Sequence, residues 1–115
     1  MTTKQCIFCS MAKDPVHPSP IYRDDRVFVV KDIKPKAPVH LLIIPNMHLN
    51  SLAYIGPGQV PIMGHMFVVA EEMARREGVT LSGFRLSLNQ GQDSGQEIDH
   101  LHLHLLAGRR LQGMG

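Results

Sequence analysis

Three histidines alternate with leucines near the end of the chain, over residues 100–106. Side chains on a β-strand point alternately to the two faces of a sheet, so His100, His102 and His104 are predicted to share one face. A strand rises about 3.3 Å per residue, which would place the first and third histidines about 13 Å apart, whereas zinc ligands lie about 2 Å from their metal. One metal ion cannot bind all three, so we expect the three imidazoles to have different roles.

The middle histidine, His102, is the best candidate for a nucleophile. An ordinary imidazole has a pKa of about 6.5 and is mostly neutral at pH 7, which allows it to attack phosphorus. Attack would give a phosphohistidine-type intermediate that water then hydrolyses, so that one difficult displacement becomes two easier steps. His104, two residues further on the same face, could donate to a phosphate oxygen or to the leaving group.

A polar loop that contains glycines, residues 89–97, directly precedes the histidines. Glycine lets backbone N–H groups approach phosphate oxygens, and the side chains of Asn89 and Gln96 can donate further hydrogen bonds. His40 opens an apolar strand and is a fourth candidate imidazole, although a single histidine in such a place is more often structural. The loop and the histidines together predict an anion site around His102.

Short apolar runs predict the strands that position these residues. Residues 21–23 and 26–31 have the pattern of a β-hairpin. Residues 39–45 are almost continuously apolar and predict a central strand, and residues 84–89 alternate like a half-buried strand. The histidine strand over residues 100–106 is the fifth.

One long helix is predicted between Gly58 and Gly78. Pro61 suits its first turn, and Gly78 suits its C-terminal cap. Apolar side chains at helical spacing are expected to face the core rather than a ligand: Met63, Met66, Phe67, Ala70, Met73 and Ala74. With a short N-terminal helix or turn, these elements predict an α+β domain with a largely antiparallel five-stranded sheet.

Size and composition predict one domain over residues 1–115. The chain is 43% hydrophobic and 19% charged, which suits a globular domain with a modest core. The formal net charge of +2 is too small to predict binding to nucleic acid or to an anionic membrane, and it leaves room for the phosphate of a small ligand. The sequence shows neither a membrane-spanning apolar run nor the apolar run of a signal peptide, so we expect a cytoplasmic protein. Cys6 and Cys9 then predict a metal half-site or a thiol pair rather than a structural disulfide.

These residues resemble the signature of the histidine-triad (HIT) family, HφHφHφφ with φ hydrophobic, and residues 100–106 fit it at every position. The resemblance covers nearly the whole chain and is carried also by Asp32, Ile33, residues 40–45, the helix, Asn89 and residues 95–97. It is strongest to the Hint branch, which consists of homodimeric purine nucleoside phosphoramidases. It therefore implies a HIT-like fold, a homodimer and a small-molecule purine nucleotide as substrate.

The resemblance also implies a role for each residue of the site. His102 would attack the α-phosphate and carry a nucleotidyl-histidine intermediate, with its ring oriented by a backbone carbonyl. His40, Gln96 and His104 would assist catalysis. Asp32 would accept hydrogen bonds from the ribose, although from sequence alone this residue is about as typical of a turn. The remaining residues implied in nucleotide binding are Ile7, Phe8, Met11, Val30, Ile33, Asn89, Gly95 and Glu97, the last standing where some relatives have serine.

A second resemblance, to zinc-carrying HIT proteins with a CxxC motif, implies a structural Zn²⁺ site. Its ligands would be Cys6, Cys9, His48 and His100, a Cys₂His₂ set that suits a closed tetrahedral site. This would give His100 a role separate from catalysis. From the residues alone, two buried thiols and an exposed His48 are the alternative.

Two other functions remain compatible with the sequence. One is a dinucleoside polyphosphate hydrolase, which would use the same nucleophile. The other is a zinc-supported nucleotide-binding interaction module with little turnover.

Overall fold

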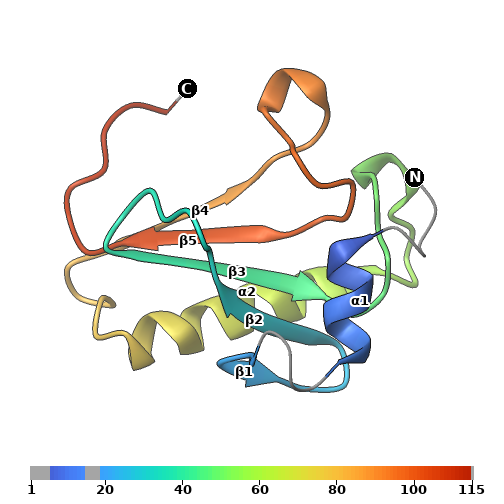
Figure 1. Cartoon of the computed structure of the whole chain (residues 1–115), viewed down its shortest axis with the longest axis horizontal. Coiled ribbons are helices and arrows are strands. Elements are labelled where there is room, and N and C mark those ends of the chain that lie inside the picture. Colours follow the sequence, from blue (N-terminus) through green and yellow to red (C-terminus); the bar gives the residue numbers. More distant parts are fainter. Residues whose placement is uncertain (1–5, 15–18, 115) are drawn as a thin grey trace.

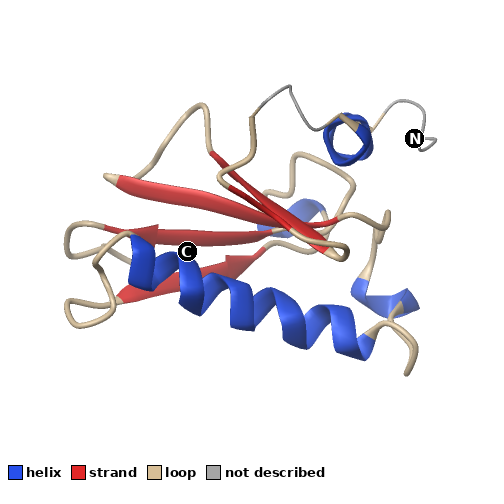
Figure 2. Cartoon of the chain, turned by 90° about the horizontal axis from the view of Figure 1, so that it is seen from below, coloured by secondary structure: helices blue, strands red, loops and turns tan. Residues whose placement is uncertain are grey.

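The computed structural model describes residues 6–14 and 19–114. A five-stranded antiparallel sheet separates two helices that lie on its opposite faces (Figures 1 and 2). The strands are β1 (Tyr22–Arg23), β2 (Val27–Lys31), β3 (Val39–Pro45), β4 (Phe84–Leu88) and β5 (Leu103–Ala107), in the order β1-β2-β3-β5-β4. The helices are α1 (Ile7–Lys13) and α2 (Val60–Arg76), and two short 3₁₀ helices are η2 (Leu52–Tyr54) and η3 (Gln92–Ser94). The predicted α+β class, with one long and one short helix, is confirmed.

The α2 face of the sheet holds the larger part of the core. Alternate residues of the central strands, such as Leu41, Ile43 and Leu105, pack there against the buried stripe of the helix, as the period of two requires. That stripe consists of Met66, Val69, Ala70, Met73 and Ala74, with Met63 partly buried beside it. No helix among the described residues is long and apolar enough to cross a membrane.

The prediction that Phe67 of α2 faces the core is wrong. Phe67 is 51% exposed, whereas Val69, which the prediction omits, is buried at 2% exposure. The buried positions follow i, i+3, i+4, i+7 and i+8 from Met66, and Phe67 lies a further 100° around the helix, outside that stripe. The predicted end of the helix is confirmed, because Gly78 has a φ of 71° and donates its N–H to the carbonyl of Arg75.

The opposite face of the sheet is only partly covered, by α1. Phe8 and Cys9 of this helix pack against Phe28 and other apolar side chains of β2 and β3. Arg23 of β1 holds the end of α1, since its guanidinium donates to the carbonyl oxygens of Ala12 at 2.9 Å and Met11 at 3.0 Å. The rest of this face is open, and the candidate site lies there.

The histidine strand is shorter than predicted. β5 begins at Leu103, so His100 and His102 precede it rather than belong to it, and the spacing expected for a regular strand over residues 100–106 is wrong for its first half. Pro45 ends β3 next to this point and has no N–H with which to continue the ladder beyond the Ile43–Leu103 pair. The N–H of Leu101 instead donates to the carbonyl of Leu49 at 2.6 Å.

Candidate active site and metal site

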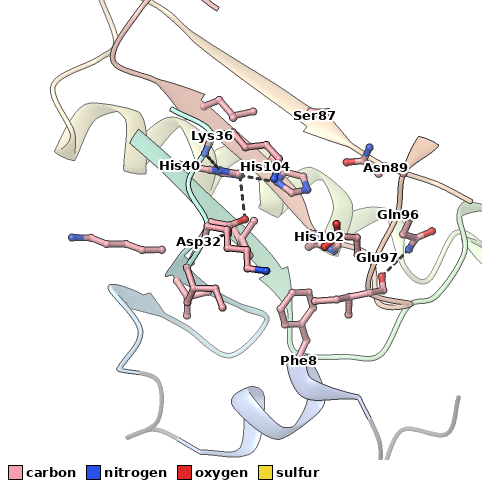
Figure 3. Close-up of a pocket in the computed structure, with 18 of the residues that line it drawn as sticks. Phe8, Asp32, Lys36, His40, Ser87, Asn89, Gln96, Glu97, His102 and His104 are labelled. Carbon is pink, nitrogen blue, oxygen red and sulfur yellow. Dashed lines mark hydrogen bonds and ion pairs between the residues drawn. The ribbon is translucent and has the colours of Figure 1, made fainter. Parts of the chain in front are cut away.

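A cavity of about 620 Å³ opens on the sheet face beside α1 (Figure 3). It brings together every residue that the sequence predicts for catalysis or nucleotide binding: Ile7, Phe8, Met11, Val30, Asp32, Ile33, His40, Asn89, Gly95, Gln96, Glu97, His102 and His104. The prediction misses eight further lining residues, namely Lys31, Lys34, Lys36, Leu42, Ser87, Ser94, Ile98 and Leu106. Ser87 could have been found, because it alternates with the apolar residues of β4 and must therefore face away from α2.

The α1 end of the cavity is apolar. Phe8 is buried there, and the centre of its ring lies 5.1 Å from that of His102 in an edge-on contact. Ile7 is 53% exposed and Ile33 is 92% exposed, so both lie at the rim rather than in the core. Exposed isoleucines beside a buried aromatic ring form a surface on which a flat apolar group can stack.

The ring of His102 is fixed by the backbone. Its Nδ1 lies 2.8 Å from the carbonyl oxygen of His100, and only 7% of the residue is exposed. A carbonyl oxygen can only accept, so Nδ1 carries the proton and donates it. The other nitrogen, Nε2, therefore has the free electron pair that a nucleophile needs.

The ring of His104 carries its proton on the opposite nitrogen from that of His102, and a chain of hydrogen bonds from a backbone N–H sets this position. The N–H of Lys36 donates to Nδ1 of His40 at 3.1 Å, so the neutral His40 ring carries its proton on Nε2. That Nε2 lies 2.9 Å from Nδ1 of His104 and donates to it, which leaves the proton of the neutral His104 ring on Nε2. Burial lowers the pKa of His40 and that of His104. The pKa of His104 falls to about 4, because the adjacent His102 and His40 lower it further. Both rings are therefore neutral at pH 7.

Asp32 forms the turn that is one of the two roles the sequence leaves open for it. Its Oδ1 accepts the N–H of Lys34 at 2.8 Å, which is a turn, and its Oδ2 lies 3.4 Å from Nε2 of His40. The carboxylate therefore lies at the cavity wall next to the hydrogen-bonded pair His40 and His104 (Figure 3).

The loop before the histidines is held in shape by its own amides. Gly91 and Gly95 have φ angles of 86° and 81°, which favour glycine. The side chain of Gln96 accepts the N–H of Gly91 at 2.8 Å and donates to the carbonyl of Ile98 at 3.0 Å, and Asn89 donates to the carbonyl of Ser94 at 2.6 Å. Each NH₂ group has a second N–H, so these amides can brace the loop and still donate to an anion.

A second cluster lies beyond α1, where the predicted metal ligands meet. One ligand atom from each of Cys6, Cys9, His48 and His100 lies within 4.8 Å of the others. Cys6 Sγ is 3.3 Å and Cys9 Sγ 3.7 Å from His100 Nδ1, and Cys9 Sγ is 3.1 Å from His48 Nδ1. Tetrahedral zinc with bonds of about 2.0–2.3 Å separates such ligands by about 3.6 Å, so the four atoms fit this geometry.

The protonation of this cluster also suits a cation. His100 Nε2 donates to the carbonyl of Pro45 at 2.8 Å, which leaves the electron pair of Nδ1 facing the thiols. Burial lowers the pKa of His100 to about 4, whereas burial and the neighbouring Cys6 raise the pKa of Cys9 to about 11. Buried thiols with a raised pKa ionise readily only beside a positive charge, which a metal ion would supply. His100 also connects the two sites, because its carbonyl orients His102.

Comparisons with known proteins agree with this geometry. The family model described as "Scavenger mRNA decapping enzyme C-term binding" matches residues 5–114. The purine nucleoside phosphoramidase of Escherichia coli is 36% identical over 111 residues, which are 96% of this chain and 93% of that protein. The structure of a histidine triad protein from Clostridium difficile has a TM-score of 0.91 at 39% identity, with all of both chains covered (100%). A Zn-bound histidine triad family protein from Mycobacterium smegmatis has a TM-score of 0.73 at 28% identity, over 94% of this chain and 78% of that one.

Proposed function

The chain belongs to the histidine-triad (HIT) family, and on that premise we propose that it hydrolyses purine nucleoside 5′-phosphoramidates, with residues 1–115 forming one catalytic domain. The named activity of the Escherichia coli relative supports this substrate class. The purine would stack at the α1 end of the cavity, and the ribose hydroxyls would donate to Asp32. The α-phosphate would then lie between His102 and His104.

The chemistry would proceed in two displacements at phosphorus. His102 Nε2 attacks the α-phosphorus, the bond from phosphorus to the leaving nitrogen breaks, and the leaving amine takes up a proton from solvent. Water then attacks phosphorus, releases a proton to solvent, the bond to His102 breaks, and the nucleoside monophosphate leaves, so that the two steps together consume one water molecule. His104 Nε2–H, Asn89 and Gln96 would donate to the phosphate oxygens as charge develops on them.

The observation that carries this proposal is the pair of opposite ring arrangements in one cavity. His102 presents an electron pair and His104 presents a proton, and the backbone fixes both. A site that only binds nucleotides has no need of an unprotonated, oriented nitrogen beside a donor. The test is the release of AMP from an adenosine phosphoramidate: His102→Ala should abolish turnover and retain nucleotide binding. Equal turnover by the wild type and the variant would contradict the proposal.

We propose further that the Cys₂His₂ cluster holds a structural Zn²⁺ ion. Cys6, Cys9, His48 and His100 would be its ligands, and the ion would join α1, the segment after β3 and the chain before β5. The Zn-bound relative from Mycobacterium smegmatis supports zinc as the metal. A closed site of this kind supplies folding stability rather than chemistry, so we assign it no catalytic step.

We also propose a homodimer. α2 carries exposed apolar residues at helical spacing, with Val60 59%, Phe67 51% and Val68 65% exposed, and β4 is an edge strand of the sheet. An apolar helix face beside an open edge suits the self-complementary contact of a twofold dimer. Sedimentation should give a dimer that Phe67→Glu converts to a monomer, and a monomeric wild type would refute this proposal.

A further inference from the structure

A second cavity adjoins the first beyond His104. It has a volume of about 490 Å³ and is lined by Lys36, Arg85, Leu106, Arg109, Leu111 and Gln112. Lys36 and Leu106 line both cavities, so the two cavities are adjacent. In Figure 3, Lys36 and Ser87 lie at the end of the site that is opposite Phe8.

The second cavity is strongly cationic. Three of its six lining residues carry a positive charge, and none of the six carries a negative one. Arg85 donates to the carbonyl oxygens of Gln112 at 3.2 Å and Gly113 at 2.9 Å, and Arg109 donates to that of Lys36 at 2.9 Å. Neither guanidinium has an ion pair with a carboxylate among residues 6–14 and 19–114. Neutral carbonyls thus hold both groups in place without cancelling their charge, and a guanidinium has five N–H groups to offer.

The sheet order places Arg85, on the edge strand β4, beyond the expected phosphate position as seen from the expected base position. The expected base and ribose positions lie over β2 and the residues that follow it, the attacked phosphorus lies over β5, and β4 comes next in the sheet. On β4, Ser87 pairs with His104, and Arg85 is two residues further along, paired with Leu106. From the spacing of strands and residues, the Cα atoms of Arg85 and His104 are about 8 Å apart, within reach of a long side chain.

We propose that this second cavity is an anion subsite for the leaving group, so that the preferred substrate is a nucleotide whose leaving group carries a carboxylate or phosphate a few atoms from the scissile bond. The inference rests on the proposed function and specifies its substrate class. Arg85, Arg109 and the ammonium group of Lys36 would bind the anion. The fixed guanidinium groups would give the leaving group a direction as well as affinity.

The test uses three adenosine 5′-phosphoramidates that differ only at the end of the amine: 3-aminopropionamide, which is neutral, β-alanine, which ends in a carboxylate, and 2-aminoethylphosphonate. For the wild type, kcat/KM for AMP release should be about five- to tenfold higher for the two anionic substrates than for the neutral one. In Arg85→Gln and Arg109→Gln this ratio should fall towards one, and in Arg85→Glu it should invert. Arg75→Gln, on the other side of the sheet where Arg75 pairs with Glu71, is the matched control and should keep the ratio.

Each outcome decides the inference. A ratio near one in the wild type, or a preference that survives Arg85→Glu, overturns the anion subsite while AMP release still supports the proposed function. A preference for only one of the two anions identifies the group that the cavity takes. If none of the three substrates is hydrolysed, the affinity of the same compounds for His102→Ala is measured instead. Tighter binding of the two anionic compounds, inverted when Arg85→Glu is added to this variant, would support the subsite even though the proposed turnover fails. If binding too shows no preference, the subsite is overturned together with the proposed function.

Discussion

Replacing Lys36 with proline tests whether a backbone N–H sets the protonation of two histidines. This substitution removes the N–H that donates to His40 Nδ1, and no positive φ is recorded for a non-glycine residue among those described, so proline is compatible with the sign of φ at this position. The side chain of His40 is 1% exposed, so no water can replace the lost donor. A buried acceptor left without a partner costs about 1–3 kcal/mol.

The protein can respond to this loss in two ways. If His40 keeps its proton on Nε2, the cost appears as a loss of about 1–3 kcal/mol in the free energy of unfolding. If His40 moves the proton to Nδ1, its Nε2 presents an electron pair to His104, 2.9 Å away, and His104 must turn its own proton inward. The phosphate then loses a donor, which lowers kcat by about 10²-fold or more.

The comparison variant is Lys36→Ala, which also lacks the ammonium group and keeps the N–H. Urea unfolding, AMP release and ¹⁵N NMR of the imidazole rings at pH 7 should be measured for both variants. We expect His104 to be protonated on Nε2 in the wild type and in Lys36→Ala, and Lys36→Pro to fall in stability or in kcat. The reasoning is refuted if the proline variant matches the alanine variant in all three measurements. His40→Phe, which removes the donor to His104 and keeps a ring in place, should lower kcat in the same way.

Three further predictions concern the pH dependence of stability, the hydrogen bond between Asp24 and His65 of α2, and the metal site. The folded protein keeps His104 neutral down to about pH 4 whereas the unfolded chain protonates it near pH 6.5, so stability should fall as the pH drops through this window. The share due to His104 is about 1–2 kcal/mol after allowance for its partial exposure, and urea unfolding of His104→Gln at pH 7 and pH 4.5 should show a weaker pH dependence than the wild type. At Asp24, burial opposes ionisation, but hydrogen bonds from Tyr22, His65 and two backbone N–H groups outweigh it and hold the pKa well below its usual range. Asp24→Asn should therefore lower the free energy of unfolding by about 1–3 kcal/mol at pH 7. This difference should begin to shrink as the pH falls below the unfolded pKa of about 3.8, because the unfolded chain is then protonated while the folded protein keeps the charge until its own, lower pKa is reached; a constant difference would count against the charge as the cause. The wild type should show an equimolar zinc signal in elemental analysis, and Cys9→Ser should lose this signal together with about 3 kcal/mol of stability. If the purified wild type contains no zinc, Cys9 is a buried thiol and not a metal ligand.

Much of the fold follows from local patterns in the sequence. The alternation in residues 84–89, the apolar run over 39–45 and the glycine at position 78 each act over a few residues, and the structure matches them to within one residue. Phe67 was not predictable in this way, because helical spacing defines a stripe only to within about one position, and the sheet decides where its centre lies.

Every predicted catalytic and nucleotide-binding residue lies in the cavity, but the proton positions of its histidines were not predicted. The sequence places His102 and His104 two apart, and it predicts a nucleophile and a donor without showing which ring nitrogen of each carries the proton. Only tertiary contacts distinguish them, namely the carbonyl of His100 for one ring and the N–H of Lys36, passed on through His40, for the other. The end of the strand at Leu103 is also a tertiary effect, since it depends on Pro45 in the neighbouring strand.

The central claim is that His102 Nε2 attacks phosphorus. It is tested most directly by mixing the protein with an adenosine phosphoramidate, quenching within the first turnovers and mapping the modified peptide by mass spectrometry. We expect AMP attached to His102 in the wild type and no adduct in His102→Ala. AMP release without any adduct at His102, or an adduct at His104 or His40, would contradict it.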